Sequence, residues 1–215
     1  MAKKERYIPA LNQNWLTPLY DPLLKWGMRE EEFKRHLVDT AHLANHQRVL
    51  DLGSGTGTLT ILMKQSYPAM SLVGLDGDAA MLEIARKKAE QAGLEIEWQE
   101  ALATALPFED GSFDRVVSCL MTHHLTAPNK VKAFQEVKRV LKPDGEFHIL
   151  DFGKPTRLLM KLISIPMARL EEAGDNYRGL LPQMLRQAGF TRILDIRHFT
   201  TIFGELVHYQ ISMST

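Results

Sequence analysis

Three glycines and two aspartates form the first group of residues in this chain that could do chemistry. The segment Gly53–Gly57 reads Gly-Ser-Gly-Thr-Gly and follows an apolar run that contains Asp51. Glycine tolerates positive φ angles and lets backbone N–H groups approach a ligand closely, so the segment predicts a nucleotide-type binding loop. A carboxylate at Asp51 would repel a pyrophosphate and attract an ammonium or sulfonium group.

The position of the third glycine separates this loop from a dinucleotide-binding loop. A dinucleotide loop has its third glycine one residue later, where this chain has Thr58. Asp76 ends the next predicted strand, and an acid there can accept hydrogen bonds from both hydroxyls of a ribose. An ordinary turn aspartate is the alternative for Asp76. The combined pattern favours a ligand with a ribose and a cationic amino-acid end.

A second candidate group is the histidine pair His123 and His124, which follows the predicted strand 113–120. The carboxyl ends of strands in an open α/β sheet face the ligand crevice, and an imidazole titrates near neutral pH. Either residue could act as a general base or bind the acceptor of a reaction. We prefer His124 and expect His123 to point the other way. The alternative is that both imidazoles bind local backbone and shape the turn.

The remaining histidines show no cluster in the sequence that is typical of zinc ligands, so no metal is predicted. They include His36, His42, His46, His148, His198 and His208.

Strands and helices alternate between residues 48 and 151, which predicts βα units, a parallel sheet and helices on both of its faces. A helix over 30–43 precedes them. The predicted strands are 48–51, 71–76, 95–99, 113–120 and 146–151, with helices over 58–65, 79–92 and 130–140 and a turn at 142–145.

The pattern changes after Asp151. An apolar helical insert covers 157–173, and a second helix runs from about Tyr177 to Gly189. Two strands follow, 192–199 and 201–210, and their connection is so short that they must pair antiparallel. We interpret the chain as one domain with three parts. These are an N-terminal helical cap (1–47), a ligand-binding core (48–151) and a C-terminal part with helices and a hairpin (152–215).

Composition sets broad limits on the class of protein. The chain has 215 residues, of which 45% are hydrophobic, enough for one sizeable core. Its 26 basic and 26 acidic residues give no general attraction to nucleic acid. One cysteine excludes an intramolecular disulfide and favours a reducing compartment. With no signal-peptide pattern and no apolar run of spanning length, we expect a cytoplasmic protein without a transmembrane segment.

Four segments in order resemble the class I S-adenosylmethionine-dependent methyltransferases, and among them the small ubiquinone/menaquinone-methylase-like group. The segments are 49–57, 75–78, 105–114 and 141–145, and they span about half of the chain. They are specific for the superfamily and say little about the acceptor. The resemblance implies an α/β, doubly wound Rossmann-like fold. Its seven-stranded sheet would be mostly parallel with an antiparallel last strand, and would have helices on both faces.

The resemblance also implies roles for individual residues toward the cofactor, S-adenosyl-L-methionine. Asp51 and the loop residues would hold its amino-acid end, and Asp76 its ribose. Gly77 to Met81 would line the adenine, and Tyr20 would reach the site from the N-terminal cap. The loop residues concerned are Gly53, Ser54, Gly55 and Gly57.

One departure from the family pattern affects the adenine end. The family usually has Gly-Asp-Ala before its Leu-Pro-Phe run, and that aspartate binds the adenine amino group. This chain has Ala101, Leu102 and Ala103 instead. Because the side chain of Leu102 cannot accept a hydrogen bond, we expect Leu102 and Ala103 to contact the adenine with weaker polar recognition.

The acceptor is predicted only as a class. Leu158–Ala168 is strongly apolar, which suggests a small hydrophobic or quinone-like acceptor for a methyl group. The alternative is a helix that buries its apolar face on the domain or on the second subunit of a homodimer. Two other functions stay open. One is a non-catalytic protein that binds S-adenosylmethionine or S-adenosylhomocysteine, and the other is a dinucleotide-dependent oxidoreductase.

Overall fold

The computed structural model of the chain describes residues 30–156, 160 and 173–213. The predictions made for Tyr20 and for most of the 157–173 helix therefore lie outside the described residues. Within the described ranges, no helix combines the length and the apolar character needed to cross a membrane.

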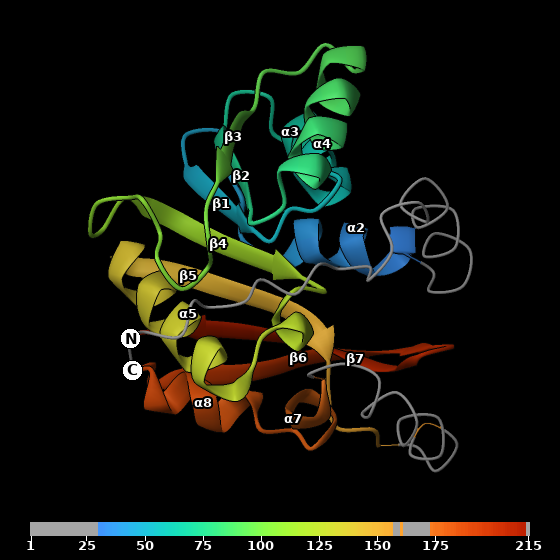
Figure 1. The fold of residues 1–215 in the computed structure, drawn as a ribbon, viewed down its shortest axis with the longest axis vertical. Helices are drawn as coiled ribbons and strands as arrows, with labels where there is room; N and C mark the ends of the chain where they lie inside the picture. Colours follow the sequence, from blue (N-terminus) through green and yellow to red (C-terminus); the bar gives the residue numbers. More distant parts are fainter. Residues whose placement is uncertain (1–29, 157–159, 161–172, 214–215) are drawn as a thin grey trace, which may run out of the picture.

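A single seven-stranded sheet organises the described chain, in the order β3-β2-β1-β4-β5-β7-β6 (Figure 1). Neighbours from β3 to β5 pair in parallel, whereas β7 pairs antiparallel with both β5 and β6. The predicted fold class, including the antiparallel last strand, is confirmed. The strands are β1 Arg48–Leu52, β2 Ser71–Asp76, β3 Glu97–Glu100, β4 Phe113–Cys119, β5 Leu141–Phe152, β6 Arg192–Thr201 and β7 Gly204–Ser212.

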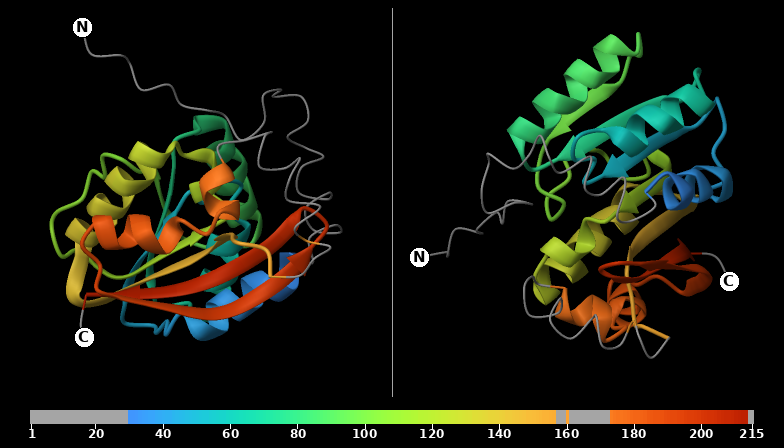
Figure 2. Two further views of the ribbon diagram at one scale, coloured as in Figure 1. Left: turned by 90° about the horizontal axis from the view of Figure 1, so that it is seen from below. Right: turned by 90° about the vertical axis from the view of Figure 1, so that its right-hand side faces the viewer.

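Helices cover both faces of this sheet. Buried side chains of α5 and α8 pack on one face, and those of α2 and α3 on the other. Figure 2 shows α5 and α8 on one side of β7 and α2 on the other side. The helices are α2 Glu30–Thr40, α3 Thr58–Ser66, α4 Ala79–Gln91, the 3₁₀ turn η2 Thr122–His124, α5 Ala127–Val140, α7 Gly174–Tyr177 and α8 Leu181–Gln187.

The interior strand β5 shows why the sheet needs both helical layers. Successive side chains of a strand point to opposite faces. Phe147 and Ile149 lie in the core cluster beneath α5, while Leu150 and Phe152 lie in the cluster beneath α2 and α3. A strand that is apolar on both sides is typical of a sheet covered on both faces.

Three helix boundaries differ from the sequence prediction for local reasons. α2 ends at Thr40 rather than at residue 43, and His42 just beyond it adopts a positive φ of 50°. The predicted helix from Tyr177 to Gly189 is the shorter α8, Leu181–Gln187, because Gly179 adopts a φ of 74° and separates it from α7, which ends at Tyr177. α5 begins at Ala127, three residues before the predicted start, with a proline in its first turn.

The predicted turn at residues 142–145 lies within β5 but without partners on β4. Leu141 pairs with Phe113, and the next pair joins Glu146 to Arg115, so the intervening residues bulge out of the ladder. A Cβ atom on Gly145 would lie 3.0 Å from the carbonyl oxygen of Lys142, which explains the glycine at this position.

Arg139 ties the long loop after β3 to α5. Its guanidinium donates to the carbonyl oxygens of Leu106 and Phe108 at 2.9 and 2.7 Å, and to the carboxylates of Asp110 and Glu136. Lysine cannot reproduce this planar set of donors. We expect Arg139→Lys to lower the free energy of unfolding by about 1–3 kcal/mol, measured by urea denaturation.

The matched control for that substitution is Arg35→Lys. Arg35 pairs with Glu31 on α2, where both side chains are more than half exposed. An exposed pair of this kind contributes about 0.3–0.5 kcal/mol. Equal losses for the two substitutions would mean that the bonds from Arg139 to the loop contribute nothing special.

Candidate functional site

The candidate site residues gather at the carboxyl ends of the parallel strands. Asp51 lies near the end of β1, Asp76 ends β2, and His123 follows β4. Asp151 lies near the end of β5, which pairs with β4. The arrowheads of β4 and β5 point the same way in Figure 1. This is the edge of an open α/β sheet where ligands bind.

The glycine loop directs most of its amides inward. The N–H groups of Gly53 and Ser54 both donate to the carbonyl oxygen of Leu75, at 2.8 and 2.9 Å. The N–H of Gly55 donates to Asp76 Oδ2 at 2.8 Å. The N–H of Gly57 donates to the carbonyl oxygen of Ser54 at 2.9 Å. These four amides are engaged within the protein, so the loop does not offer them as a pyrophosphate cradle of the dinucleotide type.

The conformation of the loop requires its glycines. Gly53, Gly55 and Gly57 have φ angles of 77°, 53° and 76°. A Cβ atom on Gly53 would lie 2.2 Å from the Cγ atom of Met121, so this glycine lets the segment after β4 pack against the loop. A Cβ atom on Gly55 would meet no described atom within 4 Å, which leaves room for a ligand on that side.

Asp51 is a buried carboxylate beneath the loop. Its side chain is 1% exposed, and its Oδ2 atom accepts a hydrogen bond from Thr60 Oγ1 at 2.6 Å. Burial raises the pKa of Asp51 to about 6, although Thr60 and the charge of Lys34 act in the opposite direction. A buried carboxylate with a raised pKa gains most from a nearby cation, since the cation favours the ionised form.

Asp76 ties the loop to the start of α4. Its Oδ2 atom accepts the N–H of Gly55, and its Oδ1 atom accepts the N–H of Asp78 at 2.9 Å. Burial raises the pKa of Asp76, and these backbone hydrogen bonds partly offset the effect. Each carboxylate oxygen has a second lone pair, so the group can accept two further hydrogen bonds.

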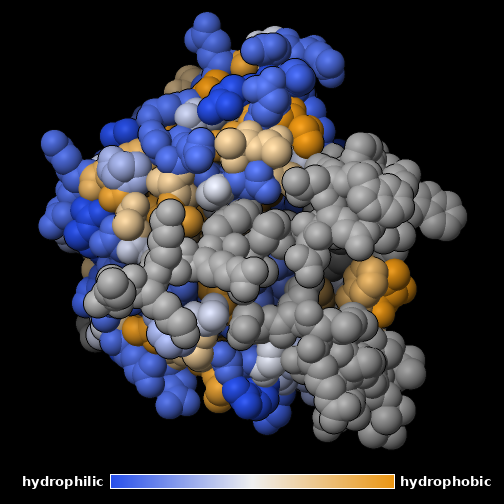
Figure 3. All heavy atoms as spheres, viewed as in Figure 1, coloured by the Kyte–Doolittle hydropathy of each residue, from blue (hydrophilic) through white to orange (hydrophobic). Residues whose placement is uncertain are grey.

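The segment after β3 lies beside Asp76. The N–H of Ala101 donates to the carbonyl oxygen of Asp76 at 3.1 Å. This hydrogen bond holds the backbone just before Leu102 beside the end of β2. Leu102 is 40% exposed, one of three large hydrophobic residues exposed in the described chain. Most of the coloured residues on the face shown in Figure 3 are hydrophilic. Ala103 packs against the core.

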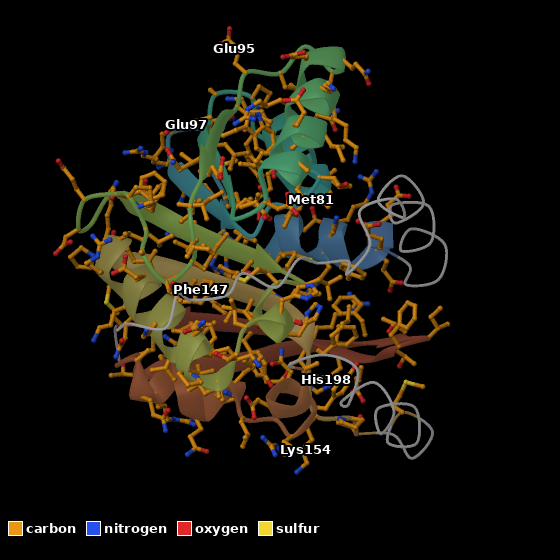
Figure 4. The ribbon with its side chains drawn as sticks, in the orientation of Figure 1. Met81, Glu95, Glu97, Phe147, Lys154 and His198 are labelled. Carbon is orange, nitrogen blue, oxygen red and sulfur yellow. The ribbon has the colours of Figure 1, made fainter. Side chains whose placement is uncertain are left out.

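Met81, marked in Figure 4, is buried in the first turn of α4, which Gly77 and Asp78 precede.

His123 and Asp151 form a buried dyad across β4 and β5. His123 Nδ1 lies 2.7 Å from Asp151 Oδ1, and both side chains are almost fully buried. An ionised carboxylate only accepts hydrogen bonds, so when the ring of His123 is neutral its Nδ1 carries the proton and its Nε2 carries the lone pair. Burial alone would raise the pKa of Asp151. The charge of His123 and hydrogen bonds from His123, Thr122 and Phe152 outweigh it and lower this pKa to about 2.

His124 lies in a different electrostatic environment. Its ring centroid is 4.0 Å from that of His123. Burial, and then the charge of His123, lower the pKa of His124 to about 3. An imidazole that holds a proton this weakly is neutral at physiological pH, and its pKa is poorly matched to general-base catalysis.

The sequence reasoning missed several residues that build this site. The sequence pattern indicates Asp151 only as the end of a strand. It also accepts hydrogen bonds from the N–H and Oγ1 of Thr122, each at 2.7 Å. Asn176 of α7 donates to Thr122 Oγ1 at 3.2 Å. Leu120 adopts a positive φ of 55° and turns the chain after β4. The only signal in the sequence is an acid at the end of one predicted strand and a histidine just after another, and it does not show that the two strands are neighbours.

The expectation that the other histidines show no cluster is wrong for part of the set. His42, Glu146 and His148 come together where β5 begins its regular pairing with β4, with one potential ligand atom from each within 4.8 Å of the others. His36 and His208 extend the group through contacts between ring nitrogens. Hairpin pairing and the packing of α2 create this cluster, so sequence spacing could not reveal it.

Comparisons with known proteins agree with this geometry. A family model described as a methyltransferase domain matches residues 49–145. The demethylmenaquinone methyltransferase of Lactobacillus johnsonii is 34% identical over 191 residues, which are 78% of this chain and 75% of that protein. The demethylmenaquinone methyltransferase of Thermus thermophilus is 39% identical over 145 residues, 66% of this chain and 64% of that protein. The chain thus spans less than two thirds of the Thermus relative.

Solved structures show the same fold at lower identity. An S-adenosylmethionine-dependent methyltransferase from Aquifex aeolicus superimposes with a TM-score of 0.68 at 21% identity. The superposition covers 92% of this chain and 96% of the Aquifex chain. The YcgJ protein of Bacillus subtilis superimposes with a TM-score of 0.68 at 20% identity, with coverage of 86% and 100%. The chain belongs to the class I S-adenosylmethionine-dependent methyltransferases, in the ubiquinone/menaquinone-methylase-like group.

Proposed function

We propose that the protein transfers the methyl group of S-adenosylmethionine to a carbon atom of a small quinol-like acceptor. The observation that carries the proposal is the buried Asp51 carboxylate beneath a loop whose amides turn inward, with the His123–Asp151 dyad at the same sheet edge. This arrangement suits a cationic cofactor and an acceptor that must lose a proton. It suits a dinucleotide poorly, which argues against an oxidoreductase.

The residues present fit the cofactor. We assign its amino-acid end to Asp51 and the loop Gly53, Ser54, Gly55 and Gly57, and its ribose to Asp76. Gly77, Met81, Leu102 and Ala103 would contact the adenine. The exposed Leu102 side chain offers an apolar surface in place of a hydrogen-bond acceptor. S-adenosylmethionine supplies an electrophilic methyl group on a sulfonium that is already a good leaving group.

The protein's own part in the reaction is to orient the acceptor and to move a proton. Deprotonation of an acceptor hydroxyl raises the electron density on the neighbouring ring carbon, which then attacks the methyl group in line. The carbon–sulfur electrons stay with sulfur as a neutral thioether, and the ring carbon loses its proton to restore the aromatic ring. We propose His123 Nε2 as the base for these protons, with Asp151 as the residue that positions it. Positioning supplies much of the remaining acceleration.

Two relatives carry the acceptor proposal, since both are named demethylmenaquinone methyltransferases. The test is to incubate the purified protein with methyl-labelled S-adenosylmethionine and reduced demethylmenaquinone. Label recovered in the quinone carbon framework supports the proposal. Label transfer only to an added nucleic acid, or S-adenosylhomocysteine binding without transfer to any reduced quinone, would contradict it and favour the non-catalytic alternative.

Three further properties belong to the same proposal. We propose one domain over 1–215, with the cap, core and C-terminal parts divided as predicted, in a cytoplasmic protein. We expect no nucleic-acid partner, because the chain carries 26 basic and 26 acidic residues. A homodimer is expected if the apolar segment 158–168 buries its face on a second subunit.

Asp51 gives a pH prediction for cofactor binding. The cofactor's ammonium favours the ionised carboxylate. The affinity for the cofactor is therefore highest above a pH of about 6, and it decreases as the pH falls through that value. We expect the affinity for S-adenosylhomocysteine to fall about tenfold per pH unit below that point, measured by calorimetry. Asp51→Asn should weaken binding at pH 7.5 and remove this pH dependence.

The same variant separates a ligand role from a structural one. Asparagine can still accept the hydrogen bond from Thr60 Oγ1 through its amide oxygen. It also removes the cost of a buried charge, so the ligand-free variant should be at least as stable as the parent. A variant that keeps the parent affinity and pH profile would remove Asp51 from the cofactor site.

A further inference from the structure

A second polar centre lies around β5, on the face of the sheet that α2 covers. His42 follows α2, and Glu146 and His148 lie two residues apart on one face of β5. Glu146 Oε2 lies 2.8 Å from His42 Nδ1 and 3.4 Å from His148 Nε2. His42 is exposed, whereas the side chain of His148 is completely buried. The methyl-transfer proposal uses none of these residues.

We propose that His42, Glu146 and His148 bind a divalent transition-metal ion of the zinc type. Two imidazoles and one carboxylate are a ligand set that zinc accepts, and zinc leaves a fourth position for water or another ligand. Zinc bonds of about 2.0–2.1 Å place tetrahedral ligands about 3.3 Å apart. The two ligand distances from Glu146 Oε2 lie on either side of that value. The three ligand atoms all lie within 4.8 Å of one another, so the side chains must close around the ion when it binds.

The surroundings of His148 fit a metal ligand. Metal-bound histidines usually donate their other ring N–H to a polar partner. His148 Nδ1 lies 3.1 Å from His208 Nε2, and His208 Nδ1 lies 3.2 Å from His36 Nε2. Metal at His148 Nε2 leaves the proton on Nδ1, where His208 accepts it. His208 can in turn donate to His36. The contact between His148 and His208 and the contact between His208 and His36 then each have one donor and one acceptor.

The carboxylate of Glu146 is held in position between the two imidazoles. Gln210 Nε2 holds the other oxygen, Oε1, at 2.8 Å, and so aims Oε2 at the two imidazoles.

One neighbour opposes a cation. Arg115 Nε lies 3.4 Å from Glu146 Oε2, so the guanidinium offsets part of the carboxylate charge. We therefore expect an affinity in the micromolar range rather than the much tighter binding of four-ligand structural sites. The ion would join the segment after α2 to β5, and its effect would be on stability rather than on methyl transfer.

The test uses the full chain without a histidine tag, freed of metal by chelation and titrated with zinc chloride. We expect one zinc per chain by calorimetry and native mass spectrometry, and a melting temperature several degrees higher in excess zinc. His42→Ala should weaken zinc binding at least tenfold and abolish the stabilisation. Because His42 is exposed, this variant should fold like the parent.

Two matched variants make the result decisive. His46→Ala removes an exposed histidine of the same segment outside the cluster, and should bind zinc like the parent. His198→Ala removes a histidine outside the cluster, which contacts the carboxylates of Asp195 on β6 and Glu205 on β7. Absence of stoichiometric zinc, unchanged binding in His42→Ala, or loss of binding only in His46→Ala or His198→Ala would overturn the proposal.

Discussion

His123→Gln should lower kcat about 10²- to 10⁴-fold and leave the affinity for S-adenosylhomocysteine within about twofold of the parent value. The side chain of His123 lies 2.7 Å from Asp151 and follows β4, whereas the loop that we assign to the cofactor follows β1. Glutamine can still donate to the Asp151 carboxylate, so the fold around the dyad is kept. It cannot accept a proton at neutral pH, so the proposed base is lost.

The matched control is His124→Gln on the next residue. The pKa of His124 is lowered to about 3 by burial and by His123, so we expect at most a tenfold loss of kcat for this variant. If His124→Gln loses turnover and His123→Gln does not, the preference for His124 drawn from the sequence is the right one. Unchanged turnover in both variants would show that neither imidazole acts as a base.

The pH profile distinguishes a base from a merely structural histidine. For the parent protein, kcat should rise with pH and reach a plateau once the base is deprotonated. His123→Gln should show no such plateau, because hydroxide then replaces the side chain as the base. A variant that kept the parent profile with a uniformly lower kcat would point to lost positioning and would contradict proton transfer by His123.

The local patterns explain which parts of the fold could be predicted. β2 runs over Ser71–Asp76 as predicted, because an apolar run bounded by a polar start and a strand-end acid defines a buried parallel strand. The hairpin of β6 and β7 was also predicted, since the short connection between the two runs permits only antiparallel pairing. The placement of β7 between β5 and β6 depends on long-range pairing.

The candidate site divides in the same way. Asp51, the loop glycines and Asp76 could be found because they lie at strand ends that the sequence pattern defines. The partnership of His123 with Asp151 could not, because it requires β4 and β5 to be neighbours in register. The histidine cluster is still more remote from any local signal. His36 and His208 are 172 residues apart and meet only because α2 packs across β7.

Replacing Asp76 with asparagine should weaken S-adenosylhomocysteine binding about 100-fold. We assign two ribose hydroxyls to this carboxylate, and hydrogen bonds to a charged group are worth about 1.5–3 kcal/mol each. Asparagine offers one acceptor oxygen instead of two, and the N–H groups of Gly55 and Asp78 already compete for it. Asp78→Asn is the control, since asparagine also caps helices and should keep the bond to the N–H of Ala80.

Weaker binding by Asp76→Asn could come from lost recognition of the ribose or from lost support of the loop. A deoxyribose analogue of S-adenosylhomocysteine distinguishes these two causes. If Asp76 accepts the ribose hydroxyls, the parent should bind the 2′-deoxy analogue about tenfold more weakly than the normal ligand, and the variant should bind the two almost equally. If Asp76 is only a turn acid that holds Gly55 and Asp78, the variant loses stability without ligand and keeps the full tenfold preference. Calorimetry with both ligands on both proteins therefore decides whether this carboxylate recognises the ribose or only supports the loop around it.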